Sequence, residues 1–192
     1  LLASLGGRFH LVGHSYGAAL ALVIALAWPQ RVASVVLYEP TAFPLLGRPG
    51  PGDPDATGIA AVATVAMAAV DRGDLHAAAE SFIDYWMGAG SWAAMPEARR
   101  GPVAASMRPI AQWTEALFAQ PWPLPALAAL PMPVLLLGGA LSPASAHDVL
   151  PILAAAMPQA RLHMLPGLGH MAPVTHPQAV NPLISAFLRS LA

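Results

Sequence analysis

The chain of 192 residues contains no cysteine and no lysine, and only 10% of its residues are charged. Without cysteine it has no disulfide, no thiol nucleophile and no thiolate metal ligand, which fits a reducing compartment, and we expect a cytoplasmic protein. All nine basic residues are arginine, the only adjacent pair is Arg99-Arg100, and the net charge is −1. This composition excludes the basic surface that nucleic-acid binding requires.

The sequence also offers little support for a membrane segment. The longest uncharged stretch that looks apolar, residues 9–28, has the length of about 20 residues that spans a bilayer. Glycines, His14, Ser15 and Tyr16 interrupt it, and a strand followed by a buried helix explains it better. Because 56% of the 192 residues are hydrophobic, the chain can bury a core of ordinary size, and we expect one globular domain with an insertion. We expect no membrane partner.

Apolar runs typical of strands buried on both faces of a parallel sheet occur at residues 8–12, 32–38, 133–139 and 160–167. Helix-like stretches follow or separate these runs at residues 17–28, 145–157 and 182–191. For the last helix we expect Asn181 as the N-cap and Pro182 as the first helical residue. The βαβ alternation predicts the α/β class with a parallel sheet.

Residues 41–130 interrupt this alternation. Pro-rich segments at 43–58 and 121–133 bound the interruption, and the stretches 74–86 and 110–118 have helical spacing of apolar residues. The interruption follows a strand end, where ligands bind in open α/β sheets. We therefore favour an all-helical cap over ordinary core helices or an insertion unconnected with substrate. Six aromatic residues are candidates to line its cavity: Phe43, Trp86, Trp92, Trp113, Phe118 and Trp122.

The most informative motif is GHSYG at residues 13–17, which stands between a strand-like and a helix-like run. A serine on a sharp strand-to-helix turn has a strained backbone, so the positions two before and two after it require small side chains. Gly13 and Gly17 meet this requirement. Ser15 is therefore a candidate nucleophile, and a serine hydroxyl needs a nearby base to take its proton.

The motif and its surroundings resemble the α/β-hydrolase family, and the resemblance continues through Pro29, Arg31 and Val32 to the Gly169-His170 turn. The resemblance implies a serine hydrolase with a core at residues 1–40 and 131–192 and a helical cap at 41–130. It also implies that the catalytic histidine lies in the loop after the last strand.

On this resemblance His170 is the base, and the backbone N–H of Tyr16 belongs to the oxyanion hole. The glycine neighbours of His170 let its turn bend over the sheet edge. His14, inside the motif, is a less favoured base, because the side chain at that position packs beside the strand. We expect His176 at the surface or at a helix entry.

In the family the nucleophile follows the fifth strand, whereas here it stands at position 15 of a chain that begins with Leu1. We expect the chain to be the C-terminal portion of a longer protein, with counterparts of strands five to eight. The first four strands, and the loop that gives the other oxyanion-hole N–H, have no counterpart in it. An apolar edge left by these strands predicts self-association of the isolated chain.

The acid of the triad departs from the usual family pattern, in which an Asp follows strand seven. Here Ser142 stands at that place, and a neutral hydroxyl cannot stabilise an imidazolium as a carboxylate does. Glu39 ends the predicted strand at 32–38, and the haloalkane dehalogenase branch is similar in placing a Glu there. We favour Glu39; the alternatives are Asp148, which also fits a helix N-cap, a carboxylate outside this chain, or none.

Together these residues predict a hydrolase that forms an acyl-enzyme on a small ester, lactone or related carbonyl substrate. C–C bond hydrolysis and cofactor-free haloperoxidase-like activity are further options in the family, whereas dehalogenases and epoxide hydrolases use Asp where this chain has Ser15. We expect no cofactor. We expect no metal either, because the sequence has no HExxH motif and no clustered carboxylates. The alternative is a non-catalytic binding or interaction protein on the same fold.

Overall fold

A computed structural model of the chain describes residue 4, residues 6–47 and residues 58–191. Most of the Pro-rich segment predicted at 43–58 lies outside these residues. The strands form one parallel sheet in the order β1-β2-β3-β4: β1 (Phe9–His14), β2 (Val32–Tyr38), β3 (Val134–Gly139) and β4 (Ala160–Leu165). The predicted α/β class with a parallel sheet is confirmed.

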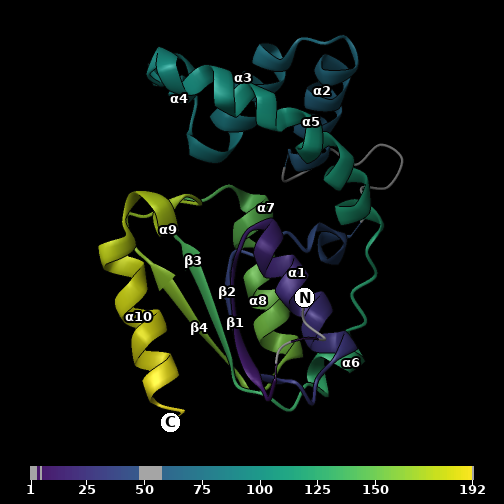
Figure 1. Cartoon of the computed structure of the whole chain (residues 1–192), viewed down its shortest axis with the longest axis vertical. Helices are drawn as coiled ribbons and strands as arrows, with labels where there is room; N and C mark the ends of the chain where they lie inside the picture. Colours follow the sequence, from purple (N-terminus) through teal and green to yellow (C-terminus); the bar gives the residue numbers. More distant parts are fainter. Residues whose placement is uncertain (1–3, 5, 48–57, 192) are drawn as a thin grey trace.

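Helices cover both faces of this sheet (Figure 1). Strands β2 and β3 are almost wholly buried, as expected for strands in the middle of a parallel sheet. Val35 and Leu37 pack toward α1 (Tyr16–Ala27) and α8 (Val149–Ala156). Val36 packs on the other face with α10 (Pro177–Arg189), because successive side chains of a strand point to opposite faces.

The uncharged run at residues 9–28 consists of β1 and α1, as the sequence predicts. Five residues of α1 are buried against the sheet, which accounts for its apolar composition. No helix in the described parts of the chain is both long enough and apolar enough to cross a bilayer.

Between β2 and β3 the described chain is helical: η2 (Phe43–Leu46), α2 (Ile59–Asp71), α3 (Leu75–Met87), α4 (Ser91–Ala94), α5 (Glu97–Ala119) and α6 (Leu124–Ala128). Helix α3 starts where its apolar spacing predicts, and the Asp74 side chain caps it by accepting the Ala77 N–H at 3.0 Å. Helices α2 to α5 lie beyond the C-terminal ends of the strands (Figure 1). The boundaries of the cap at residues 41 and 130 stay a prediction.

The prediction for the last helix is wrong at its start. Helix α10 begins at Pro177, and Pro182 lies inside it instead of at its first position. The reason is the apolar stripe of Val180, Leu183, Ile184 and Phe187, which packs against the sheet and takes Val180 into the first turn.

The predicted helix at 145–157 is interrupted at Asp148, between α7 (Ala144–His147) and α8. Asp148 stands at the N-cap position of α8, but the side-chain cap considered for it is not seen. The Asp148 side chain makes no capping hydrogen bond. Ser145 is buried, and its hydroxyl accepts a 2.7 Å hydrogen bond from the Tyr85 hydroxyl of α3. This bond ties the helical layer to the core.

Candidate active site

Ser15 lies at the sharp turn between β1 and α1. Its φ of 55° falls in the left-handed region, which residues other than glycine rarely adopt. Its backbone N–H donates to the Tyr38 carbonyl at 2.9 Å, which ties the turn to β2. The backbone at this position is therefore strained, as the motif predicts.

The two glycines of the motif differ in what they contact. A Cβ at Gly13 would lie 2.6 Å from the backbone N and Cα of Ala18, so glycine alone fits where α1 crosses the strand. A Cβ at Gly17 would meet nothing within 4 Å among the described residues, apart from the neighbouring backbone of its own helix. Contacts therefore explain why a small residue is needed at Gly13, and they do not explain it at Gly17.

The structure brings Ser15, His170 and Glu39 together in one chain of hydrogen bonds. His170 Nε2 lies 3.0 Å from Ser15 Oγ, and His170 Nδ1 lies 2.7 Å from Glu39 Oε2. Because a carboxylate only accepts, Nδ1 carries the proton and donates it to Glu39, which leaves Nε2 to accept the Ser15 hydroxyl. This is the arrangement in which an imidazole takes a proton from a serine.

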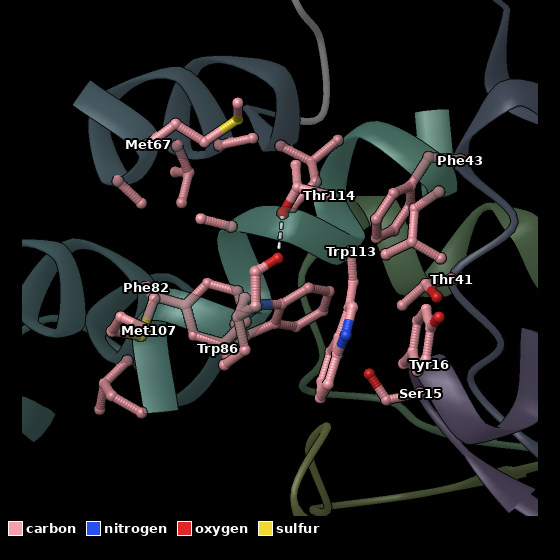
Figure 2. Close-up of a pocket in the computed structure, with 18 of the residues that line it drawn as sticks. Ser15, Tyr16, Thr41, Phe43, Met67, Phe82, Trp86, Met107, Trp113 and Thr114 are labelled. Atoms are coloured by element: carbon pink, nitrogen blue, oxygen red, sulfur yellow. Dashed lines mark hydrogen bonds between the residues drawn. The ribbon is translucent and has the colours of Figure 1, made fainter. Parts of the chain in front are cut away.

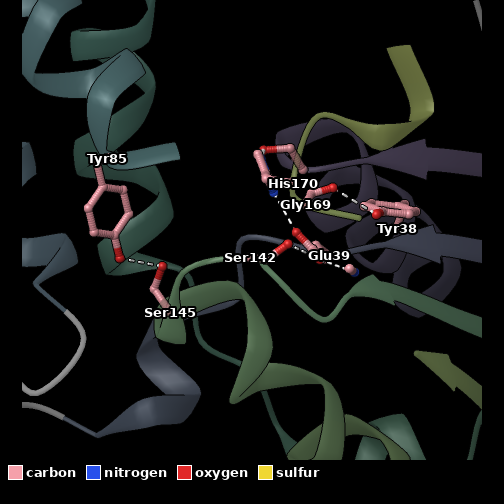
Figure 3. Close-up of polar contacts among 9 residues, drawn as sticks. Tyr38, Glu39, Tyr85, Ser142, Ser145, Gly169 and His170 are labelled. Carbon is pink, nitrogen blue, oxygen red and sulfur yellow. Dashed lines mark hydrogen bonds and ion pairs between the residues drawn. The ribbon is translucent and has the colours of Figure 1, made fainter. Parts of the chain in front are cut away.

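Glu39 is fully buried at the end of β2, and its φ of 47° also lies in the left-handed region. Its charge is compensated by three donors. Oε1 accepts the Gly139 N–H at 2.6 Å and the Ser142 hydroxyl at 2.6 Å, while Oε2 accepts His170 Nδ1–H (Figure 3). In the sequence Ser142 stands where the family usually has an Asp. In the structure its hydroxyl is a hydrogen-bond donor to the Glu39 carboxylate.

Three further features shape the surroundings of His170, and no sequence pattern predicted them. The Tyr38 hydroxyl donates to the Gly169 carbonyl at 2.9 Å (Figure 3). Burial and then the nearby charge of Glu39 raise the pKa of Tyr38, which keeps this donor protonated. Gly139 has no room for a side chain against the backbone of Leu168, and the Trp86 indole of α3 stacks on the imidazole of His170 at 4.0 Å.

The alternative candidates take no part in this chain of hydrogen bonds. His14 stands beside His170 with ring centroids 4.8 Å apart, and its Nε2 has no partner among the described residues. Burial and then the proximity of His170 lower the pKa of His14 to about 4, so it is neutral at pH 7. Asp148 is exposed beside His147 and not beside His170, and His176 is exposed at the junction of α9 (Ala172–Thr175) and α10.

Tyr16 is the first residue of α1, a position whose N–H has no acceptor within its helix. No acceptor for it occurs among the described residues. Its ring stacks on Trp113 of α5, with centroids 4.9 Å apart. The N–H thus stands next to Ser15, where an oxyanion-hole donor is expected. No group of three or more metal-ligating side chains gathers in the part of the chain that the structure describes.

A cavity of about 300 Å³ opens at Ser15 between the sheet edge and helices α2, α3 and α5 (Figure 2). Four of the six aromatic candidates line it: Phe43, Trp86, Trp113 and Phe118. Trp92 and Trp122 do not. Trp92 packs among the helices of the layer above the sheet, and Trp122 packs in the core.

A second hollow of about 410 Å³ is lined by Ser142, Thr175 and His176, among others. His170 and Trp86 line both spaces, so their stacked rings form part of the wall between them. The imidazole itself is buried, with His170 3% exposed.

A sequence model of the alpha/beta hydrolase family matches residues 1–183. The chain belongs to the alpha/beta hydrolase family. This confirms the family predicted from the GHSYG motif and its context. Comparison with curated protein sequences gives no match.

Solved structures of alpha/beta hydrolases resemble this family member over nearly its whole length. A thermophilic esterase from Thermogutta terrifontis has a TM-score of 0.72 at 24% identity, covering 98% of this chain and 67% of its own. The 2-hydroxy-6-oxo-6-phenylhexa-2,4-dienoate hydrolase from Rhodococcus sp. strain RHA1 has a TM-score of 0.66 at 22% identity, covering 95% of this chain and 64% of its own. Est816, described as an N-acyl homoserine lactone degrading enzyme, has a TM-score of 0.64 at 21% identity, covering 94% of this chain and 68% of its own.

At these identities the likeness shows the fold of the alpha/beta hydrolase and not its substrate. The chain spans about two thirds of the length of these structures.

Proposed function

We propose that this alpha/beta hydrolase is a serine hydrolase that cleaves a small ester or lactone through an acyl-enzyme. The observation that carries the proposal is the chain of hydrogen bonds from the part-buried Ser15 through His170 to the buried Glu39. This series of hydrogen bonds opens onto the cavity at Ser15 and follows the order of nucleophile, base and acid.

In the proposed reaction Ser15 Oγ forms a bond to the carbonyl carbon while its proton passes to His170 Nε2. The electron pair of the C=O bond moves onto the carbonyl oxygen, and the Tyr16 N–H donates to that oxyanion. The tetrahedral intermediate collapses, the bond to the leaving alcohol breaks, and His170 returns its proton to the departing oxygen.

Water then attacks the acyl-enzyme by the same route. His170 takes a proton from the water and gives it to Ser15 Oγ as the acid product leaves. Glu39 stabilises the imidazolium that forms in both halves of the cycle. Ser142 and the Gly139 N–H hold the carboxylate in place.

The geometry favours ester hydrolysis over one other reaction represented among the similar folds. The Rhodococcus hydrolase is named for a dienoate, which carries a carboxylate. The carboxylate of such a substrate would meet no Arg side chain among the described residues that line the cavity. We therefore place C–C bond hydrolysis of such acids second.

Covalent labelling by a fluorophosphonate probe, read by intact mass, tests the proposal. We expect one equivalent of label on the chain, none on Ser15→Ala, and normal labelling of Ser106→Ala, which alters an exposed serine of α5. Labelling that persists in Ser15→Ala would remove Ser15 as the nucleophile. No labelling at all would favour a non-catalytic binding protein.

A further inference from the structure

The walls of the cavity at Ser15 carry almost no polarity. Helices α2, α3 and α5 contribute aliphatic, aromatic and methionine side chains, and Figure 2 shows Met67, Phe82 and Met107 on the side away from Ser15. None of the described lining residues is Arg, Asp or Glu. A ligand that fills this space therefore exchanges water for apolar contacts.

Beyond Ser15, Tyr16 and His170, which stand at the reaction centre, the few polar groups of the lining cannot balance a negative charge. The Thr114 hydroxyl donates to the Ile110 carbonyl at 2.9 Å within its own helix. His14 is neutral at pH 7, because its pKa is lowered to about 4. Thr41 Oγ1 and Trp86 Nε1 are buried and have no partner among the described residues, but both are uncharged donors.

Size sets a second limit on the ligand. An apolar cavity of about 150 Å³ holds one benzene molecule. The cavity of about 300 Å³ is twice as large.

From these observations we infer that the site accepts esters with an uncharged, apolar acyl group of roughly a dozen carbon atoms at most, and rejects acyl chains that end in a carboxylate. The inference rests on the proposed function and specifies its substrate class. A carboxylate in this cavity would lose its hydration without gaining a cation or a sufficient set of donors.

Two substrates that differ only at the chain end test this: 4-nitrophenyl octanoate and the mono-4-nitrophenyl ester of octanedioic acid. We expect kcat/KM to be at least about 100-fold lower for the second ester, because its carboxylate must be desolvated. Values for the two esters that agree within about threefold would overturn the inference.

A variant pair at Met67 gives a second measurement. Met67 lines the cavity and is 36% exposed, so a longer charged side chain fits at its place. Met67→Lys should reduce the ratio of kcat/KM for the octanoate ester to kcat/KM for the octanedioate ester by about tenfold. The neutral Met67→Gln should leave this ratio unchanged. An unchanged ratio in a folded Met67→Lys chain would contradict the inference.

Ligand binding separates this inference from the proposed function. Calorimetry on Ser15→Ala with octanamide and with octanedioic acid monoamide needs no turnover. Binding of octanamide alone supports the inference even where the wild-type chain takes up no fluorophosphonate, an outcome that would refute only the proposed chemistry. Equal binding of the two amides, or binding of neither, overturns it.

Discussion

The hydroxyl of Ser142 donates a 2.6 Å hydrogen bond to Glu39, which lies 103 positions earlier in the sequence. Ser142 follows β3 and Glu39 follows β2, so the ends of two neighbouring strands deliver a hydroxyl and a carboxylate to one place. The other oxygen of that carboxylate accepts from His170. A carboxylate carried by residue 142 would consequently stand close to the same imidazole.

This relationship predicts that the acid of the site can be moved between strands. Glu39→Gln should lower kcat by about 10² to 10⁴-fold, because the imidazolium loses its counter-charge. The double variant Glu39→Gln/Ser142→Asp should recover at least about tenfold of this loss. The measurement is kcat for 4-nitrophenyl octanoate.

Ser142→Asp alone is the matched control, because it buries a second carboxylate beside Glu39 and should lower the thermal midpoint. Near-full activity of Glu39→Gln would remove Glu39 as the acid. A double variant no faster than Glu39→Gln would show that residue 142 does not reach His170.

The unequal glycines of the motif give a prediction about stability. Gly13→Ala should lower the free energy of unfolding by at least about 2 kcal/mol, because its Cβ would overlap the backbone of Ala18. Gly17→Ala should raise it by up to about 1 kcal/mol, since alanine favours the helix and meets no obstacle. Urea unfolding of both variants measures this, and equal losses would contradict it.

The strands and the turn at Ser15 were predictable because each depends on short-range pattern, whereas the roles of His170 and Glu39 came from the resemblance to the α/β-hydrolase family. β2 is a continuous apolar run that ends at Glu39, and Ser15 stands in a local motif. Ser15 and Glu39 come together because parallel strands end at the same edge of the sheet. The βαβ alternation of the sequence predicts such a parallel sheet.

What escaped prediction depends on how distant segments dock. The stacking of Trp86 on His170 needs the placement of α3 over the sheet, which no spacing within α3 encodes. The bond from Tyr38 to Gly169 joins residues 131 positions apart. The start of α10 was misplaced because Pro182 was given the role of a first-turn residue, whereas burial of Val180 decides where that helix begins.

Tyr38 holds the turn that carries His170, and removing its hydroxyl should loosen that turn. Tyr38→Phe should cost about 1 kcal/mol in the free energy of unfolding, the usual worth of one hydrogen bond. It should also lower kcat for 4-nitrophenyl octanoate by less than about tenfold, since both triad contacts remain. An unchanged kcat and an unchanged unfolding midpoint together would show that the bond positions nothing.

His14 predicts how stability depends on pH. Its pKa falls from the ordinary 6.5 to about 4 in the folded chain, through burial and then through His170. Between these two pH values the His14 side chain binds a proton more readily in the unfolded chain than in the folded chain. The contribution of neutral His14 to stability is therefore lost as the pH falls from 6.5 toward 4. The slope from this group cannot exceed about 1.4 kcal/mol per pH unit.

Urea unfolding at several pH values checks this, with His14→Gln as the control because glutamine does not titrate. The variant should show a smaller loss of stability between pH 6.5 and 4. Identical slopes for the two chains would mean that other groups set the acid sensitivity.

We also predict that the chain self-associates. β1 forms one edge of the described sheet, and Val12 on this strand is 54% exposed, so unpaired backbone and apolar surface stand together. Val12→Lys should reduce association, because a charge on an edge strand opposes pairing. Sedimentation velocity of both chains measures this, and a monodisperse wild-type monomer would refute it.

The hydrogen bond between His170 and Ser15 closes a loop of 155 positions. Contacts of such long range form only after the chain has paid most of its loop-closure entropy, which makes them slow and late in folding. Reactivity of Ser15 toward a covalent probe should therefore appear with the last step of refolding. It should be lost as soon as the turn that carries His170 opens, so the rate of probe uptake reports when the fold is complete.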